Sequence, residues 1–164
     1  MEHQEQKLKG RTFLVAVDEG EHSLYALQWA LDTLYIGTAP DDHIVVLYVK
    51  PSHATLSGPA FVLTSEAVDS LERYDNLVVS KILSTVYQIC GERKVRFEVK
   101  VLTGDPRDII TETAHALKAT FLVMGSHGFG AIKRALLGSV SDYCSHHVHC
   151  PVVIVKKPEG VSEI

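Results

Sequence analysis

Glycines and serines gather in one stretch of the chain, 125-GSHGFGAIKRALLGSVS-141, where they could hold a phosphate. Gly125, Gly128 and Gly138 follow the spacing Gly-x2-Gly-x9-Gly, and Ser139 comes directly after the last of them. Glycine lets the backbone approach a ligand closely, and the N–H groups at a helix start favour an anion. The stretch has no Gly-Lys-Ser or Gly-Lys-Thr, so it lacks the lysine of the usual phosphate-binding loop. We therefore predict a phosphate site made mainly of backbone amides and hydroxyls; the alternative is a plain turn followed by a serine N-cap.

Cysteine and histidine side chains gather in a second stretch, 144-CSHHVHC-150, where they could bind a metal ion. If this stretch is helical, His146 and Cys150 lie on one face and His149 lies beside His146. The rest of the sequence offers no second ligand cluster with the spacing of a zinc finger. The alternative is a last helical turn whose histidines bond to terminal carbonyl groups, followed by a small buried cysteine. Metal binding through residues 144–150 therefore stays an alternative function.

Short segments with strand character predict the sheet that positions these stretches. The segments 12–17, 44–49 and 121–125 are apolar on both faces, as strands inside a parallel sheet are. The segment 151–155 is a further apolar run. In 95–101 apolar and charged residues alternate, which is typical of a strand with one wet face.

Helical patterns separate these strands along the chain. Leucines at helical spacing follow the first strand, and a long amphipathic segment precedes the third. Asp105 and Pro106 provide an N-cap and a first-turn proline for the next helix. The last helix is predicted over 139–149, and the proline, glycine and serine content of 51–64 predicts a loop.

Strands that alternate with helices predict the α/β class, with one parallel five-stranded sheet and helices on both faces. Residues 11–157 form this single domain, with short tails at 1–10 and 158–164. The strand orders 2-1-3-4-5 and 3-2-1-4-5 are both common, and periodicity does not separate them, although the alternating third strand favours an order that leaves it at an edge. In either order a ligand binds at the carboxyl ends of the strands, where the strand order reverses.

The composition argues against several classes of partner. The chain has a net charge of −4 and no basic excess, so nucleic acid is not an expected partner. Its first ten residues are polar and no apolar run reaches the length of a membrane span, so we expect neither a leader peptide nor a membrane anchor. Its three cysteines lack C-x-x-C spacing, which favours a reducing, cytoplasmic location without disulfides.

With these elements in place, the sequence resembles the universal stress protein family over roughly residues 12–157. The resemblance rests on Asp18 after the first strand and on the long-spaced glycine motif that ends in Gly138-Ser139-Val140-Ser141. Gly104-Asp105 before the third helix and Cys150-Pro151 before the fifth strand are further similarities. The resemblance implies a Rossmann-like fold of the adenine nucleotide alpha hydrolase type with the strand order 3-2-1-4-5, homodimers, and a role in stress tolerance.

The same resemblance implies a binding site for ATP, or for ADP or AMP, together with Mg²⁺. It places adenine beside Ala16, Val17 and Val49, and it places Asp18 near the ribose, the phosphates or a Mg²⁺ ion that Asp18 holds through water. The nucleotide site would further include residues at the end of the fourth strand and in the glycine motif: Met124, Gly125, His127, Gly128, Gly138, Ser139, Val140 and Ser141. The chain departs from many members at Gly20, where they carry Ser, and from some at Val17, where they carry Thr. Both differences remove polar groups from the first-strand end of the site.

These implications favour a nucleotide-dependent regulatory module in the stress response, with little or no catalytic turnover. Efficient ATP hydrolysis needs a metal ion, a positioned water and a charge clamp on the γ-phosphate. Lys133 or Arg134 could reach phosphates and His127 could orient a water, but a solvated face and a simple hydrogen-bond donor are the plainer roles. A slow ATP hydrolase is therefore kept as the enzymatic alternative, and the sequence does not name the regulatory protein partner.

The two edge strands of the order 3-2-1-4-5 differ in their protection. Arg96, Glu98 and Lys100 place charges along the third strand, which is a common defence against edge pairing, whereas 152-VVIV-155 has four apolar residues in a row. We therefore predict a homodimer in which the strand 151–155 pairs antiparallel with its copy.

Overall fold

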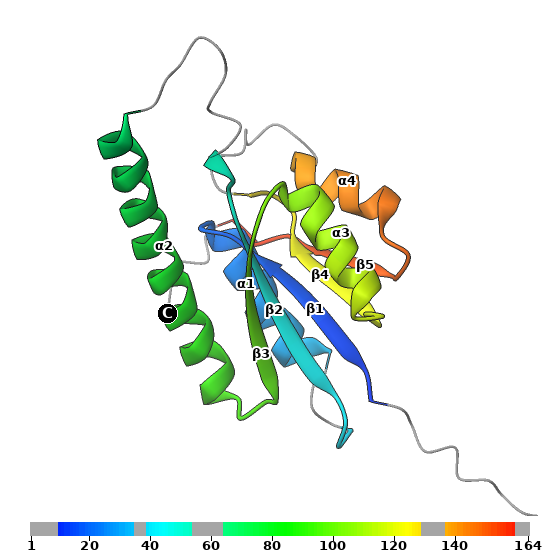
Figure 1. The fold of residues 1–164 in the computed structure, drawn as a ribbon. Coiled ribbons are helices and arrows are strands. Elements are labelled where there is room, and N and C mark those ends of the chain that lie inside the picture. Colours follow the sequence, from blue (N-terminus) through cyan, green and yellow to red (C-terminus); the bar gives the residue numbers. More distant parts are fainter. Residues whose placement is uncertain (1–9, 35–38, 54–63, 129–136, 160–164) are drawn as a thin grey trace, which may run out of the picture.

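A computed structural model describes residues 10–34, 39–53, 64–128 and 137–159 of the chain. They form a parallel sheet of five strands in the order β3-β2-β1-β4-β5 (Figure 1), which confirms the predicted fold class and the strand order that the resemblance implied. The strands are β1 (Thr12–Val17), β2 (His43–Lys50), β3 (Phe97–Thr103), β4 (Phe121–Gly125) and β5 (Val152–Val155). The helices are α1 (Glu21–Thr33), α2 (Ser65–Glu92), α3 (Pro106–Ala116) and α4 (Ser139–His147).

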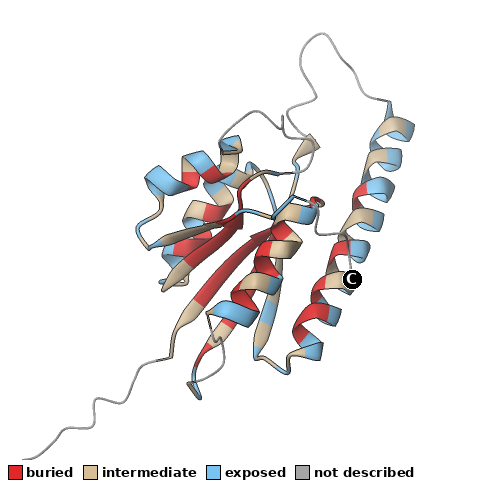
Figure 2. Ribbon diagram, turned by 180° about the vertical axis from the view of Figure 1, so that it is seen from behind, coloured by how far each residue is buried: buried red, intermediate tan, exposed pale blue. Residues whose placement is uncertain are grey.

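The helices cover both faces of the sheet, because successive side chains of a strand point to opposite faces. Phe13 and Val15 of β1 join side chains of α1 and α2 in one buried cluster. Leu14 and Ala16 join side chains of α3 and α4 in the other. Figure 2 shows that the buried residues concentrate on the central strands and on the inner sides of the helices.

Several element boundaries differ from the prediction by one or two residues, and two of them have a local structural reason. β3 begins at Phe97 rather than at residue 95, because Lys94 has a φ of 52° in the turn after α2 and the chain needs further residues to reach the sheet. α4 ends at His147 rather than at residue 149, and Val148 already has an extended backbone with φ −80° and ψ 138°. The fourth helix is therefore too short to carry the whole of the predicted histidine and cysteine cluster.

Parts of four predicted segments lie outside the described residues. They are residues 1–9 of the first tail, residues 54–63 of the predicted loop, residues 129–136 of the glycine-rich stretch and residues 160–164 of the last tail. In the described ranges, no helix is long and apolar enough to cross a membrane.

An ion pair joins the amino ends of β1 and β2, opposite the carboxyl ends of the strands. The buried carboxylate of Asp42 accepts hydrogen bonds from the Arg11 backbone N–H at 2.8 Å and from the Arg11 Nε at 3.1 Å. The hydrogen bonds from Arg11 hold the pKa of Asp42 below its usual range, although burial acts in the opposite direction. The next residues, Thr12 and His43, are paired in the sheet. The ion pair therefore supports the register of the two strands whose other ends meet at the ligand edge.

We expect Asp42→Asn to lower the free energy of unfolding by about 2 kcal/mol near neutral pH, because it removes the charge from hydrogen bonds in a buried site. The folded pKa of Asp42 is lowered from the ordinary value of 3.8. Its stabilising contribution is therefore present above that value and is lost as the pH falls through the lower folded pKa. Urea denaturation at several pH values should show the difference between the native chain and the variant shrinking in acid.

Asp41→Asn is the matched control, since Asp41 is the adjacent carboxylate and is exposed. Equal stability of the Asp42 and Asp41 variants at neutral pH would contradict the role given to the ion pair.

Candidate functional site

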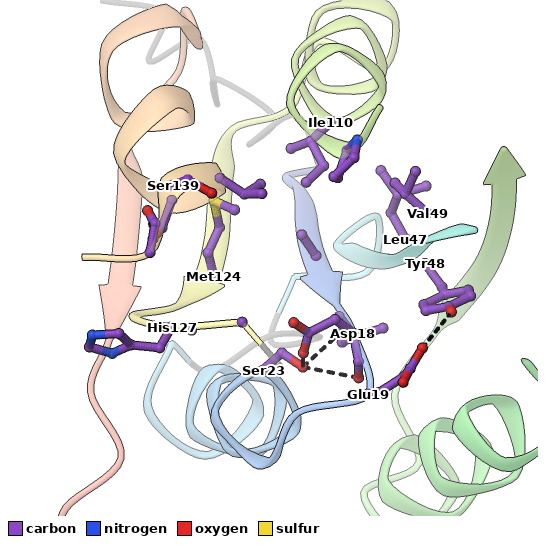
Figure 3. A pocket seen from close by; sticks show the side chains of 18 of the residues that line it. Asp18, Glu19, Ser23, Leu47, Tyr48, Val49, Ile110, Met124, His127 and Ser139 are labelled. Atoms are coloured by element: carbon purple, nitrogen blue, oxygen red, sulfur yellow. Dashed lines mark hydrogen bonds between the residues drawn. The ribbon is translucent and has the colours of Figure 1, made fainter. Parts of the chain in front are cut away.

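A pocket of about 430 Å³ opens at the carboxyl ends of β1, β2 and β4 (Figure 3). The strand order reverses between β1 and β4, which is where the fold predicts a ligand. The volume lies within the range of small-molecule sites, about 300–1,000 Å³. Residues of β1, β2, β4, α1, α3 and α4 all contribute to the wall, so six elements from different parts of the sequence build one site.

One part of the pocket wall is apolar. Side chains of β1, β2 and β4 that point towards α3 and α4 meet apolar residues from those two helices. The apolar lining consists of Ala16, Leu47, Val49, Pro106, Ile110, Met124 and Val140. A wall of this kind suits the faces of a flat, poorly solvated ring.

The opposite part of the pocket is made by closely packed backbone. Gly138 donates its N–H to the Ser126 carbonyl at 2.8 Å. The Ser141 hydroxyl lies 2.9 Å from the Gly138 carbonyl and 3.2 Å from the Ser126 carbonyl, so it donates within the same loop. A Cβ atom added to Gly138 would lie 3.4 Å from the Gly128 nitrogen. These contacts hold the start of α4 beside the end of β4, and the first-turn N–H groups of α4 lack partners within their helix.

The N-cap of α4 is Gly138, and no side chain caps this helix. The alternative in which Ser139 is a plain N-cap is therefore wrong, and Ser139 is the first helical residue. Ser141 is only 3% exposed, and its hydroxyl joins the two halves of the glycine motif. In the described part of this loop, the first-turn amides of α4 are therefore the groups available to an anion.

Asp18 follows β1 and is held by the first turn of α1 (Figure 3). Its Oδ1 accepts hydrogen bonds from the Ser23 hydroxyl at 2.7 Å and from the Gly20 N–H at 2.9 Å. Its own N–H donates to the Ser23 Oγ at 2.9 Å. A Cβ atom added to Gly128 would lie 2.9 Å from Oδ2, so this oxygen lies directly against the glycine loop, by which we mean the described residues 125–128 and 137–138 of the glycine motif. The pocket therefore brings a carboxylate next to closely packed backbone.

Tyr48 and Glu19 form a second polar pair at the pocket. The Tyr48 hydroxyl lies 3.4 Å from the Glu19 Oε1, at the long end of hydrogen-bond distances. Burial, reinforced by the negative charge of Glu19, raises the pKa of Tyr48 to about 12. The phenol is therefore neutral at physiological pH and can only donate to the carboxylate.

The His127 ring points away from Asp18 and Ser139 (Figure 3). Its Nδ1 lies 3.0 Å from the Ser126 Oγ, and its ring centroid lies 5.7 Å from that of His22 in α1. His127 also lines the pocket. Its contribution to the pocket wall is therefore mainly its backbone, while its ring packs towards α1.

The oxygen ligands near the glycine loop suit Mg²⁺ only as a shared site. Mg²⁺ is usually bound by one or two carboxylates together with the phosphates of a substrate. Among the described residues, no group of three or more His, Cys, Asp or Glu could hold a metal ion by itself. Asp18, with Oδ2 against Gly128, fits a site in which a phosphate supplies the remaining ligands.

The stretch 144–150 does not act as one cluster. The Nδ1 atoms of His146 and His147 each lie 2.8 Å from a carbonyl oxygen one turn earlier in α4. The ring of His149 contacts His115 of α3, with the centroids 6.1 Å apart. Because α4 ends at His147, Cys150 does not share a helical face with His146 as predicted. Cys150 is half-buried rather than buried, and burial raises the pKa of its thiol.

All twelve residues predicted for the nucleotide site line this pocket: Ala16, Val17, Asp18, Val49, Met124, Gly125, His127, Gly128, Gly138, Ser139, Val140 and Ser141. Their individual roles towards a nucleotide stay predictions. Lys133 and Arg134, considered as phosphate contacts, lie outside the described residues.

Sequence reasoning missed seven lining residues: Glu19, Ser23, Leu47, Tyr48, Pro51, Pro106 and Ile110. Leu47 could have been found, because it lies two residues before Val49 and so on the same face of β2. Pro106 could also have been found, because a helix that follows a parallel strand begins at the ligand edge. Ser23 gave no local signal, since its approach to Asp18 depends on the angle at which α1 leaves the sheet.

Sequence comparison finds relatives of one family. The model of the universal stress protein family matches residues 10–156. The chain is 36% identical to the universal stress protein PHOS34 of Arabidopsis thaliana over 88% of this chain and 61% of that protein. It is 39% identical to a universal stress protein of Methanocaldococcus jannaschii over 91% of this chain and 84% of that protein. The match thus spans less than two thirds of the length of the plant relative.

Solved structures of the same family share the fold. UspA of Lactobacillus plantarum has a TM-score of 0.72 at 17% identity, covering 90% of this chain and 98% of that chain. A family protein of Arabidopsis thaliana with AMP bound has a TM-score of 0.63 at 22% identity, covering 91% and 93%. A universal stress protein in complex with cAMP has a TM-score of 0.62 at 25% identity, covering 88% and 96%. On the match of the family model to nearly the whole chain, the protein belongs to the universal stress protein family.

Proposed function

We propose that this chain binds an adenine nucleotide in the pocket, preferentially ATP with Mg²⁺, and works as a nucleotide-dependent regulatory module in the stress response. The observation that carries the proposal is the convergence of the β1 end, the β2 end and both halves of the glycine motif on one pocket with an apolar wall and a polar end. The AMP and cAMP bound by two structures of the family support an adenine nucleotide as the class of ligand.

The apolar wall is the proposed place for adenine. Ala16 and Val49 lie on it, and Val17 closes the adjacent end of β1. Removal of the ring from water is the main gain there, at about 25 cal/mol for each Å² of apolar surface buried. Asp18 follows directly, so the ribose and the phosphates would extend from the end of β1 towards the glycine loop.

The glycine loop and the start of α4 are the proposed place for the phosphates. The first-turn amides of a helix attract anions. The close packing at Gly125 and Gly128 brings Asp18 and the start of α1 against this loop, beside those amides. The described part of the lining contains the carboxylates of Asp18 and Glu19 and no lysine or arginine. A Mg²⁺ ion would therefore reduce the repulsion between Asp18 and the phosphates, and it would supply charge neutralisation there when bound.

Little or no turnover is part of the proposal, with a slow ATP hydrolase as the alternative. The described lining holds no group that is placed to clamp the γ-phosphate, and the His127 ring points away from Asp18.

The expected location is the cytoplasm, on the basis of three free cysteines. Burial raises the pKa of Cys90 and of Cys144 to about 11, so these thiols stay protonated.

A homodimer through β5 completes the proposal. In the described sheet β5 pairs only with β4, so its outer edge is open to a second copy. Val152, Val153 and Ile154 are half-buried, and Ile154 belongs to neither core cluster of the described residues. On the opposite edge, Glu98 and Lys100 of β3 form an ion pair at 2.6 Å that discourages pairing.

Gly138→Val should lower the affinity for ATP by at least about tenfold, or about 1.4 kcal/mol, because its branched side chain would crowd the backbone of residues 126–128. The fold should survive, since Gly138 has φ −70° and ψ 155°, an extended backbone that any residue adopts. Isothermal titration calorimetry measures the affinity. Gly91→Val is the control, because a Cβ atom there meets nothing within 4 Å. Undiminished binding by the Gly138 variant would show that the phosphates lie elsewhere.

Single-turnover assays should detect no ADP, or its formation only over hours, when excess protein is mixed with ATP and Mg²⁺. The reason is that the described lining holds no lysine or arginine that could clamp the γ-phosphate. An ATPase activity with turnover on the scale of seconds would favour the hydrolase instead. This activity would have to copurify with the protein through two chromatographic steps and be lost in Gly138→Val.

Sedimentation equilibrium at micromolar protein should give twice the 18.1 kDa monomer mass. Ile154→Glu should give the monomer, because it places a charge in the pairing edge of β5 without entering the core. Leu102→Glu puts the same change on the opposite edge strand, β3, and should leave the dimer intact. A monomeric native chain, or a dimer that survives Ile154→Glu, would remove β5 from the interface.

A further inference from the structure

The geometry points to a new role for Ser23, which we infer to be a positioning residue. It holds the carboxylate of Asp18 in the orientation in which Oδ2 can take part in binding a divalent cation together with the phosphates of a nucleotide. This inference rests on the proposed nucleotide site and deepens it, because it concerns how the chain orients its cation ligand.

The Ser23 hydroxyl both accepts a hydrogen bond from Asp18 and donates one to it. Ser23 is only 4% exposed, and its Oγ accepts the Asp18 N–H at 2.9 Å. The possible acceptors of its single proton are the Asp18 Oδ1 at 2.7 Å, the Gly20 carbonyl at 3.1 Å and the Asp18 carbonyl at 3.3 Å. A hydroxyl has one proton to donate, and the shortest contact, to a charged acceptor, is the strongest. The proton therefore lies between Ser23 and the Asp18 carboxylate.

This bond decides which oxygen of Asp18 meets the glycine loop. The last torsion of an aspartate is broad and roughly two-fold, so an untethered carboxylate can exchange its two oxygens. Here Oδ1 is held by the Ser23 hydroxyl and by the Gly20 N–H. Oδ2 is thereby fixed against Gly128, at a distance that leaves no room for a Cβ atom there. The oxygen placed next to the proposed phosphate loop is thus preset before any ligand arrives.

Ser23 also accounts for a difference noted in the sequence. At the position two residues after Asp18, where many family members carry a serine, this chain has Gly20, which supplies only a backbone N–H. The structure shows a hydroxyl reaching the same carboxylate from Ser23, in the third residue of α1. The first-strand end of the site therefore keeps a polar group that the sequence motif alone lacks.

Removal of a residue that hydrogen-bonds to a metal ligand and orients it usually lowers metal affinity by about 10–100-fold. In Ser23→Ala, Oδ1 loses its shortest hydrogen bond, so the carboxylate must be ordered when the cation binds. We expect the gain in ATP affinity caused by Mg²⁺ to fall by about tenfold. Adenosine has no phosphate to share a cation, so its affinity should change by less than about twofold, which is within the usual error of this comparison.

The experiment is isothermal titration calorimetry of the full chain with ATP plus Mg²⁺, with ATP plus EDTA, and with adenosine. It compares the native chain, Ser23→Ala and Ser23→Thr, and the Thr variant keeps the hydroxyl. The expected result is a Mg²⁺-dependent gain in the native chain and in Ser23→Thr, and its loss in Ser23→Ala with adenosine binding retained. Adenosine binding by each variant also shows that its pocket is folded.

The other outcomes separate this inference from the proposed function. A native chain that binds neither adenosine nor ATP would overturn the proposed function, and the role of Ser23 with it. A native chain that binds ATP without a Mg²⁺ effect, or a Ser23→Ala variant that keeps the full effect, would overturn the positioning role alone. Equal losses for adenosine and for ATP with Mg²⁺ in Ser23→Ala, or a Ser23→Thr variant that behaves like it, would show that the hydroxyl does not act through the cation.

Discussion

Close backbone contact between the end of β4 and the start of α1 is the constraint on which the pocket depends. A Cβ atom at Gly125 would lie 2.8 Å from the His22 carbonyl carbon and 2.9 Å from the Ser23 nitrogen, where no side chain fits. A Cβ atom at Gly128 would lie 2.9 Å from the Asp18 Oδ2, so at this position the close neighbour is a carboxylate oxygen that would have to move. Among the described glycines only Gly104 has a positive φ, so Gly125, Gly128 and Gly138 are not needed for turning. At Gly125 and Gly128 the lack of a side chain allows close approach, which brings Asp18 and the loop to one place.

This constraint links the electrostatics of the pocket to its packing. Asp18 is drawn against the glycine loop by the Ser23 and Gly20 hydrogen bonds, so a negative charge stands where phosphates are proposed to bind. The N–H groups at the start of α4 favour an anion at the same place. A carboxylate and an anion become compatible when a divalent cation lies between them, which is why the proposal couples the nucleotide to Mg²⁺. At the far end of the sheet, the Arg11–Asp42 pair supports the same two strands, β1 and β2.

The fold and the place of the pocket could be predicted because they depend on local patterns. Apolar runs identified β1, β2 and β4, and the carboxyl ends of parallel strands meet at one edge. Residues 16–18, 49 and the described ends of the glycine motif, 125–128 and 138–141, could therefore be brought together without a structure. Periodicity alone did not separate the two strand orders, although the alternating third strand favoured the one with β3 at an edge, and the family resemblance implied that order. The C-terminal limit of α4 was missed, since the three histidines at 146, 147 and 149 fit the end of a helix as well as the turn after it.

Other features of the site depend on contacts between elements, which a sequence pattern does not contain. Ser23 reaches Asp18 across the turn from β1 into α1, in a geometry set by how α1 leaves the sheet. Tyr48 meets Glu19 because β2 lies beside β1. The histidines of 144–150 looked like one cluster in sequence, yet His149 contacts His115 of another helix. Spacing along the chain predicts which residues share a face, whereas the contacts between faces follow from the packing angle.

The central claim is that an adenine nucleotide binds where the glycine loop meets Asp18. Amide chemical-shift mapping by NMR with ATP and Mg²⁺ tests it most directly, because glycine amides are well separated in such spectra. The account predicts saturable shifts at Gly125, Gly128, Gly138 and Ser139, with Gly91 at the end of α2 unchanged. Saturable shifts confined to residues outside the pocket, or no shifts at millimolar ATP, would contradict it.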